Sequence, residues 1–451
     1  MLGNIFALLF FLVPLVFVAN TSELFEFNKM MLTYAFTILI VGVWLSKMVL
    51  AKKFIYKHTF LEIPLLLYLG SHILSTAFSI DPHISIWGYY SRFHEGLLAS
   101  LSYIILYFAA VSNLNKEDVK KIFLASFASA TIISIWGALE HFGHSPSCYL
   151  VTGKFGVDCW VQDVKTRVFA TLGQPNWMAA YLCVQILILI GFVRKFKILN
   201  FKFKIDSITH SVRSRMTFLF LIILFISALI FTKSRSGYAG LAAGLGVLTL
   251  LLLKISNKIK LFLVIAGLIL VSVFGWNWYQ NLPAPGPGVT NSEAIRKPVW
   301  EGAVKIWQRY PVFGSGVETF AYSFYLDRPA SKNLDSEWDF LYNKAHNEYL
   351  NLLATTGTVG IITYLIVIGT FISWALRHSS SWREPERPIG SIKRKILSPF
   401  GLQNDVSISL QHDALFAAWV SILVTNFFGF SIVIIGLYFF LIPAFCEILS
   451  D

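Results

Sequence analysis

His346 is the residue of this sequence best suited to moving a proton. It lies in the segment 344–350, Lys-Ala-His-Asn-Glu-Tyr-Leu, where a long polar loop ends and an apolar run of membrane-spanning length begins. A histidine at that boundary would be close to water but shielded by protein, which suits proton transfer on a substrate presented from a membrane. The alternative is a histidine that only begins a helix and is satisfied by backbone or water.

Two basic residues, Lys233 and Arg235, end another apolar run in the segment 233–237, Lys-Ser-Arg-Ser-Gly. We expect this end of the run on the outer side of the membrane, where basic residues are depleted. A fixed anion would explain them, because the planar arginine side chain grips phosphate oxygens in pairs. Simple anchoring at lipid headgroups is the alternative.

Arg167 is a third basic candidate and lies just before the Gly-Gln-Pro-Asn turn 173–176. This turn predicts a tight entry into the next apolar run, with Asn176 as a helix cap. The helix N-terminus would add partial positive charge at the same face. Arg92 is a fourth candidate, although a structural turn or a pair with Glu95 would explain it equally well.

Three further residues complete the candidate substrate-binding set. Arg296 belongs to an amphipathic segment, and Asn347 and Tyr349 flank His346. Tyr349 could orient a substrate or belong to the aromatic belt at the membrane surface. We find no acidic pair in the outer loops that would hold a divalent metal, and no phosphate-binding glycine loop, zinc-ligand spacing or nucleophile elbow. The sequence therefore predicts neither a metal nor a cofactor.

The composition predicts the elements that must position these residues. The chain has 451 residues, of which 56% are hydrophobic and only 14% charged. About twelve apolar runs are long enough to span a membrane as helices. We therefore expect an all-α integral membrane protein, a single polytopic domain over residues 1–451, with a retained first span. The runs are roughly 2–19, 31–50, 61–78, 97–113, 119–140, 176–193, 217–232, 238–253, 261–276, 347–376, 411–428 and 430–447.

The distribution of charge predicts the orientation. Most of the 37 Lys and Arg residues fall in alternate loops, which would be cytoplasmic if the N-terminus is inside. We expect both termini in the cytoplasm and the candidate site outside it. The net charge of +12 then reflects contact with anionic membrane lipids rather than with nucleic acid.

The outer loops carry two further predictions. The segment 277–345, between the ninth and tenth spans, is large enough for a small subdomain that begins with the rigid linker 283–288. Apolar residues at helical spacing predict an amphipathic helix over 295–310, either a lid over a lipid-linked substrate or an interfacial helix anchored by tryptophans. Cys148 and Cys159 share an outer loop, where a disulfide is permitted, and we favour a bridge over two free thiols.

Taken in order, these motifs resemble the bacterial O-antigen ligase/polymerase family. The resemblance covers roughly residues 165–375. It is carried by Arg167 with the segment 171–176, by the segments 233–237 and 296–307 followed by 310–316, and by 345–350 with 356–360.

The resemblance implies a polytopic glycosyltransferase of the GT-C kind at the outer face of the bacterial inner membrane. Such a protein moves a glycan, without a metal, from a polyprenyl diphosphate carrier to an acceptor hydroxyl, as on a lipid A-core-like glycolipid. The resemblance further implies that Arg167 and Arg235 are functional arginines and that His346 is the functional histidine. A repeat-unit polymerase or a protein O-oligosaccharyltransferase would share this chemistry. A lipid-linked sugar transporter is a rival, but we find no internal repeat.

Overall fold

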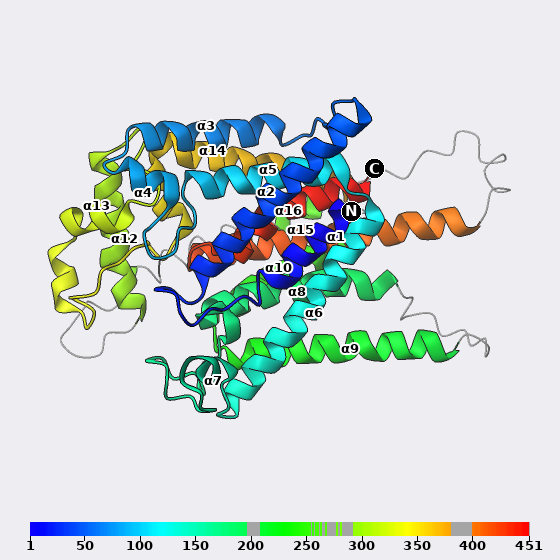
Figure 1. Ribbon diagram of the computed structural model, residues 1–451, viewed down its shortest axis with the longest axis horizontal. Coiled ribbons are helices and arrows are strands. Elements are labelled where there is room, and N and C mark those ends of the chain that lie inside the picture. Colours follow the sequence, from blue (N-terminus) through cyan, green and yellow to red (C-terminus); the bar gives the residue numbers. More distant parts are fainter. Residues whose placement is uncertain are drawn as a thin grey trace.

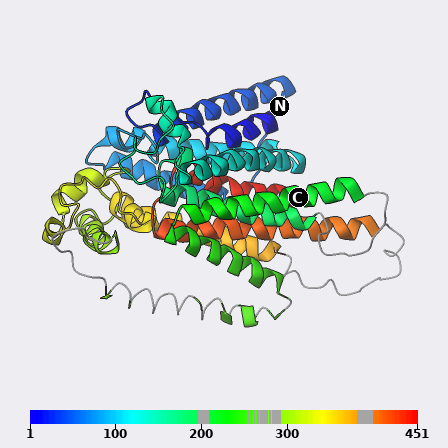
Figure 2. The same cartoon turned by 90° about the horizontal axis from the view of Figure 1, so that it is seen from below.

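The computed structural model describes residues 1–195, 208–253, 292–379 and 399–450, and a few isolated positions between 255 and 281. These residues form helices and connecting loops without any strand, so the expected all-α class is confirmed for the described part. The long helices run roughly side by side, and α12 (Ser292–Arg309) and α13 (Phe320–Asp327) cover one end of the bundle (Figure 1). Both chain termini lie away from that end (Figure 2).

The other helices follow in chain order. They are α1 (Leu2–Leu12), α2 (Glu26–Ala51), α3 (Glu62–Ala77), α4 (Pro82–Trp87), α5 (Leu97–Asn113), α6 (Lys116–His141), α7 (Pro146–Thr152), α8 (Pro175–Lys195), α9 (Ile208–Phe231), α10 (Arg235–Leu252), α14 (Glu348–His378), α15 (Pro399–Phe427) and α16 (Val433–Ser450). Short 3-10 turns occupy Ala170–Leu172 and Ala330–Leu334.

Six of the described helices are long and apolar enough to cross a membrane, namely α2, α6, α8, α10, α14 and α16. Leu2–Leu12, Leu97–Asn113 and Met216–Phe231 are apolar but shorter. The expected number of about twelve spans is therefore not confirmed. Most of the expected ninth span 261–276, the linker 283–288 and parts of the basic loops 194–216 and 377–410 lie outside the described residues.

The first expected span differs from its prediction. The apolar run 2–19 contains only the 11-residue helix α1, which ends before Pro14. At a rise of about 1.5 Å per residue, such a helix is about 16 Å long, roughly half the hydrocarbon thickness of a bilayer. Apolarity alone predicts one helix over this run. Pro14 lacks the backbone N–H that would continue the helical hydrogen-bond ladder.

Two helices form the centre of the bundle. Buried residues make up 89% of the apolar window of α8 and 94% of that of α16, against 17% for α2. α8 packs against α10 and α15, and α16 packs against α5 and α15. The loop that precedes α16 and the first turn of α8 are therefore held by the core, and both reach the candidate site described below.

α14 is broken at Gly357, where the backbone adopts φ 67° and ψ −167°. The segment 311–316 lies across this break: Thr358 and Val359 donate backbone hydrogen bonds to Pro311 and Val312. A Cβ on Gly357 would lie 2.4 Å from the carbonyl oxygen of Val312, so only glycine permits this approach. The break fixes the first turns of α14, which follow His346.

The expected amphipathic helix is present as α12. Its apolar residues Ile295, Val299, Ala303 and Ile306 are buried against α13 and the segment that precedes α14. The tryptophans pack on protein: Trp307 Nε1 donates to Thr358 Oγ1 over 3.0 Å, and the Trp300 side chain is buried. Trp300 and Trp307 thus contribute to the packing at the end of the bundle that carries α12.

Candidate functional site

His346 lies in a tightly held turn immediately before α14. Asn347 is the N-cap of the helix, and its side chain accepts a hydrogen bond from the backbone N–H of Leu350 over 3.1 Å. The Ala345 N–H donates to Asn351 Oδ1 over 3.2 Å. Between these bonds, His346 adopts φ 52°, a left-handed conformation that residues with a Cβ rarely take.

Lys344 holds the same turn in place through buried ion pairs. Its ammonium group forms ion pairs with Glu95 and Glu318, and its side chain is only 1% exposed. The two carboxylates raise the pKa of Lys344 above its ordinary value, although burial alone would lower it. Lys344 therefore stays charged, and the pair of carboxylates fixes its position.

His346 faces a cavity between the helix ends, which we call the His346 cavity. The ring lies 5.6 Å from the Tyr342 ring and 5.4 Å from the Phe430 ring, measured between centroids. Polar residues from three helices share this cavity with His346: Asn176 of α8, Ser236 of α10, and Thr425 and Asn426 of α15.

Arg92 stands beside this cavity. Its guanidinium lies 5.2 Å from the centroid of Trp177 and 5.8 Å from that of Phe430, two rings that line the His346 cavity. Within the described part of the chain, its Nη1 is buried without a hydrogen-bond partner. The alternative explanation of Arg92 was an ion pair with Glu95. In the structure, Glu95 forms an ion pair with Lys344.

Arg167 reaches the cavity wall through Asn176. Arg167 Nη2 donates to Asn176 Oδ1 over 3.3 Å, and Nε donates to the Thr232 carbonyl over 3.3 Å. Ser234 Oγ donates to the same Asn176 oxygen over 2.8 Å. Asn176 is thus not the helix cap that we expected: α8 begins at Pro175, and the Asn176 amide joins Arg167 to the start of α10.

Lys233 and Arg235 flank Ser234, the N-cap of α10, and both side chains are exposed. Ser236, one residue after Arg235, lines the His346 cavity. The positive end of the α10 dipole therefore points to the same region as both basic side chains. Arg296 of α12 is half-buried and near enough to His346 to lower its pKa.

Two candidates have evident structural roles. Asn347 is 2% exposed and caps α14. The Tyr349 hydroxyl donates to the Leu423 carbonyl over 3.1 Å, which joins α14 to α15. Both side chains are thus engaged in holding the turn and the helices around His346.

The electrostatic environment keeps His346 neutral. Burial of the ring lowers the pKa of His346 from 6.5 to about 3, helped by the positive charges of Arg296, Arg92 and Lys332. A neutral imidazole can accept a proton, but a pKa this low makes it a weak base until a negative charge arrives beside it.

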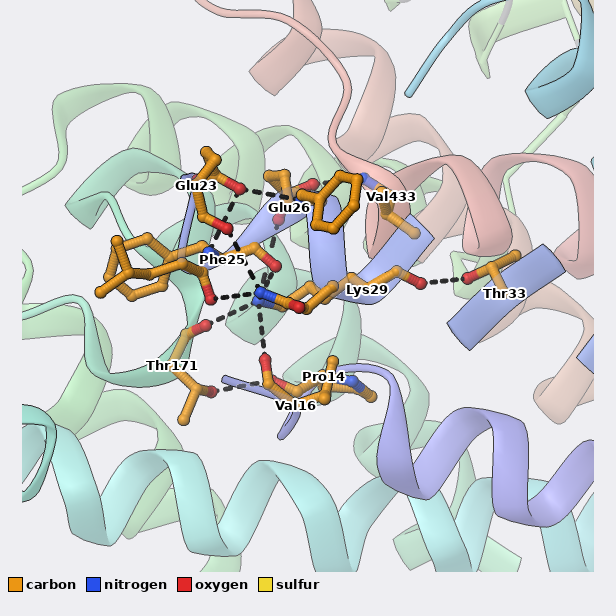
Figure 3. Close-up of polar contacts among 12 residues, drawn as sticks. Pro14, Val16, Glu23, Phe25, Glu26, Lys29, Thr33, Thr171 and Val433 are labelled. Atoms are coloured by element: carbon orange, nitrogen blue, oxygen red, sulfur yellow. Dashed lines mark hydrogen bonds and ion pairs between the residues drawn. The ribbon is translucent and has the colours of Figure 1, made fainter. Parts of the chain in front are cut away.

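A buried ion pair that the motifs did not reveal supports two loops of the site (Figure 3). Lys29 of α2 donates to the carbonyl of Thr171 over 2.7 Å and lies 3.9 Å from Glu26. Glu26 accepts from the backbone N–H of Val433 over 2.8 Å. Thr171 leads into α8, and Val433 follows the loop that carries Phe430. A charged pair at the start of an apolar run is the sequence signal that could have found it.

The disulfide loop lies against the Arg167 segment. Cys148 and Cys159 are joined in the structure, with Cα atoms 5.7 Å apart. Trp160, next to Cys159, packs on Phe25 and Phe169 with ring centroids 5.6 and 5.5 Å apart. Glu140, buried beneath this loop, accepts hydrogen bonds from the backbone N–H groups of Phe169 and Ala170 over 3.2 and 2.8 Å. The loop thus supports the segment between Arg167 and α8.

Part of the chain is similar to a known protein family. No curated protein matches the chain at a significant level. The profile of the O-antigen ligase family matches residues 218–365, which include Lys233, Arg235, Arg296 and His346. The resemblance to the O-antigen ligase/polymerase family is therefore confirmed over residues 218–365, the part of the chain that the family model matches.

Proposed function

We propose that this protein transfers a glycan from a polyprenyl diphosphate carrier to an acceptor hydroxyl at the outer face of the inner membrane. One observation carries the proposal: a neutral histidine and several cationic groups, from separate elements, meet around the His346 cavity. The family match supports glycosyl transfer in polysaccharide assembly as the general activity. The polyprenyl diphosphate donor and the glycolipid acceptor are our extension of it.

The arginines would hold the diphosphate. The anomeric carbon of a diphosphate-linked sugar is already activated, so the main task is to stabilise negative charge on the leaving diphosphate, which is often the largest catalytic contribution. Arg167 donates to Asn176, Arg235 follows Ser234, which bonds the same Asn176 oxygen, and both arginines are suited to this task. Arg92 has a buried Nη1 that a phosphate oxygen could engage.

His346 would take the proton. The acceptor oxygen attacks the anomeric carbon, the bond from that carbon to the diphosphate oxygen breaks, and the hydroxyl proton passes to the imidazole. The diphosphate leaves with the bonding electron pair, and the anomeric configuration inverts. The negative charge of the bound donor should raise the pKa of His346, so that the base gains strength only when the donor is in place. His346 then releases its proton to water.

Reconstitution tests the proposal. The full chain in nanodiscs would receive a radiolabelled undecaprenyl diphosphate oligosaccharide and rough lipopolysaccharide. We expect label on the acceptor and release of undecaprenyl diphosphate, both lost in His346→Ala. A protein that only carries lipid-linked sugar would instead move label across a liposome bilayer and release no diphosphate lipid, and that result would contradict the proposal. Label joined into longer lipid-linked chains without an added acceptor would indicate a polymerase.

A further inference from the structure

A second cavity lies beside the first and has the opposite chemical character. We call it the Glu318 cavity. Three carboxylates line it, from Glu95, Glu318 and Glu348, and they come from separate segments of the chain. Ile432 lines both cavities, so the loop between α15 and α16 forms a common wall. None of the motifs discussed above assigns a role to this cavity.

The Glu318 cavity holds more hydrogen-bond acceptors than the protein uses. Lys344 engages one oxygen of Glu95 and one of Glu318. Among the described residues, Glu95 Oε1 and Glu318 Oε2 are buried and have no partner. Native structures rarely leave such atoms unpaired, because burying them without a partner costs free energy. The arrangement therefore suits a bound group that donates hydrogen bonds.

His72 gives an independent indication of a ligand. This side chain of α3 lines the Glu318 cavity and is only 2% exposed. Its Nδ1 lies 3.1 Å from Ser100 Oγ, whereas its Nε2 has no partner within the described part of the chain. His72 does not belong to the carboxylate cluster, yet one of its two ring nitrogens is buried without a hydrogen-bond partner among the described residues. A polar group of a ligand in the cavity would supply that partner.

The walls and charges define the class of ligand. Three acidic side chains around Lys344 do not attract a diphosphate, so this cavity does not favour the anionic end of a donor. Neutral hydroxyl groups can donate to free carboxylate oxygens. Tyr68, Tyr103 and Phe440 supply aromatic surface, on which the apolar face of a sugar ring can pack. A hydroxyl-rich, uncharged ring fits all three features.

We propose that the Glu318 cavity binds a neutral sugar ring of the acceptor, while the His346 cavity binds the diphosphate end of the donor. This inference rests on the proposed function and names the site of its second substrate. The common wall places the two substrates next to each other. Glu348 accepts from the Ser431 N–H over 3.1 Å, and the neighbouring Phe430 packs on His346. The acceptor hydroxyl would reach the base past this loop.

Two variants test the site by kinetics with rough lipopolysaccharide as acceptor. Glu318→Gln keeps the shape and an oxygen for Lys344 but removes the carboxylate charge. The His72 ring lies 4.3 Å from the Tyr68 ring between centroids, and His72→Phe keeps this aromatic contact but removes both nitrogens. We expect each to raise the KM for the acceptor about tenfold or more, and to change the KM for the donor by no more than about twofold. Glu301→Gln, the same change on α12 outside both cavities, serves as the control. Native acceptor KM in both variants, or an equal rise in donor KM, would overturn the inference.

A binding measurement separates this inference from the proposed function. If the native protein transfers no glycan, the proposed function fails, but the cavity is still tested by hydrogen exchange without donor. We expect rough lipopolysaccharide alone to protect the backbone of residues 95–103 and 348–356, and inorganic diphosphate not to protect it. Absence of this protection, or protection by inorganic diphosphate, would show that the cavity does not receive the acceptor.

Discussion

At the scale of single residues, the site depends on a histidine held in an uncommon state. The φ of 52° at His346 costs conformational energy, and its neighbours maintain it through Lys344, Asn347 and Asn351. Burial and the positive charges of Arg296, Arg92 and Lys332 keep the ring neutral. In the proposed reaction, His346 would be positioned in advance as the base but would have little proton affinity until the donor adds its negative charge.

The pH dependence of the reaction should reveal this coupling. Because the pKa of His346 in the free protein is lowered to about 3, the ring is neutral throughout the range from pH 5 to 8. We therefore expect kcat/KM for the donor, which reports the free enzyme, to show no acid limb from His346 in that range. The diphosphate should raise the pKa in the complex, so that any acid limb appears in kcat and at or below about 6.5.

Replacement of the histidine provides the control for this profile. His346→Ala should insert and bind the donor normally, since the bonds that hold the turn come from Lys344, Ala345 and Asn347 and not from the His346 side chain. Its turnover should fall roughly 10²-fold or more, and the residual rate should lack the acid limb. Near-native turnover in this variant would leave His346 as a structural residue and remove the base from the mechanism.

Arg235→Lys distinguishes a phosphate ligand from a headgroup anchor. Lysine keeps the charge but cannot grip two phosphate oxygens at once, so we expect transfer to fall by about tenfold or more. Arg309→Lys changes an exposed arginine of α12 that pairs with Asp327 over 2.9 Å, and should leave transfer unchanged. Initial rates at saturating acceptor would measure both, and full activity of Arg235→Lys would identify a simple anchor.

At the scale of elements, the buried pair of Lys29 and Glu26 joins α2 to the two loops that border the His346 cavity. Lys29→Met removes the contact with Thr171 and leaves the Glu26 carboxylate buried and unpaired. We expect it to lower the free energy of unfolding by about 3–5 kcal/mol. The double variant with Glu26→Gln should recover part of that loss, as thermal unfolding in detergent would measure.

A surface pair provides the comparison for this cycle. Lys121 lies 3.7 Å from Asp118 and is 58% exposed, so Lys121→Met should cost no more than about 0.5 kcal/mol. An equally small effect of Lys29→Met would show that the buried pair does not hold the two loops.

The disulfide loop is the second element that supports the site. Under denaturing, non-reducing conditions we expect a maleimide to label only Cys183 and Cys446 of the four cysteines, and all four after reduction. Cys148→Ser should lower stability by up to about 3 kcal/mol, since the closed loop is short. Labelling of all four cysteines without reductant would contradict a native bridge.

At the scale of the whole molecule, the sequence predicted what depends on local pattern. The apolar face of α12, with Val299 and Ile306 at its centre, follows from helical spacing alone. The sequence pattern did not predict the break of α14 at Gly357. It also did not predict the pairing of Lys344 with Glu95, which are 249 residues apart. Long-range contacts of this kind leave no periodic signal, so the Glu318 cavity could be found only from the three-dimensional arrangement.

The orientation of the whole molecule carries the last prediction. Both termini lie away from the end that carries α12 (Figure 1), and we expect the termini and the His346 cavity in opposite compartments. The basic residues of the alternate loops, such as 47–57 and 112–121, predict that this end of the bundle is cytoplasmic. Lys305 on α12 and Lys53 after α2 are exposed positions at which a cysteine tests this. In spheroplasts, a membrane-impermeant maleimide should label Lys305→Cys directly and Lys53→Cys only after permeabilisation. The reverse pattern would put His346 in the cytoplasm, where a glycan donor presented at the outer face could not reach it, and the proposed reaction would have to be abandoned.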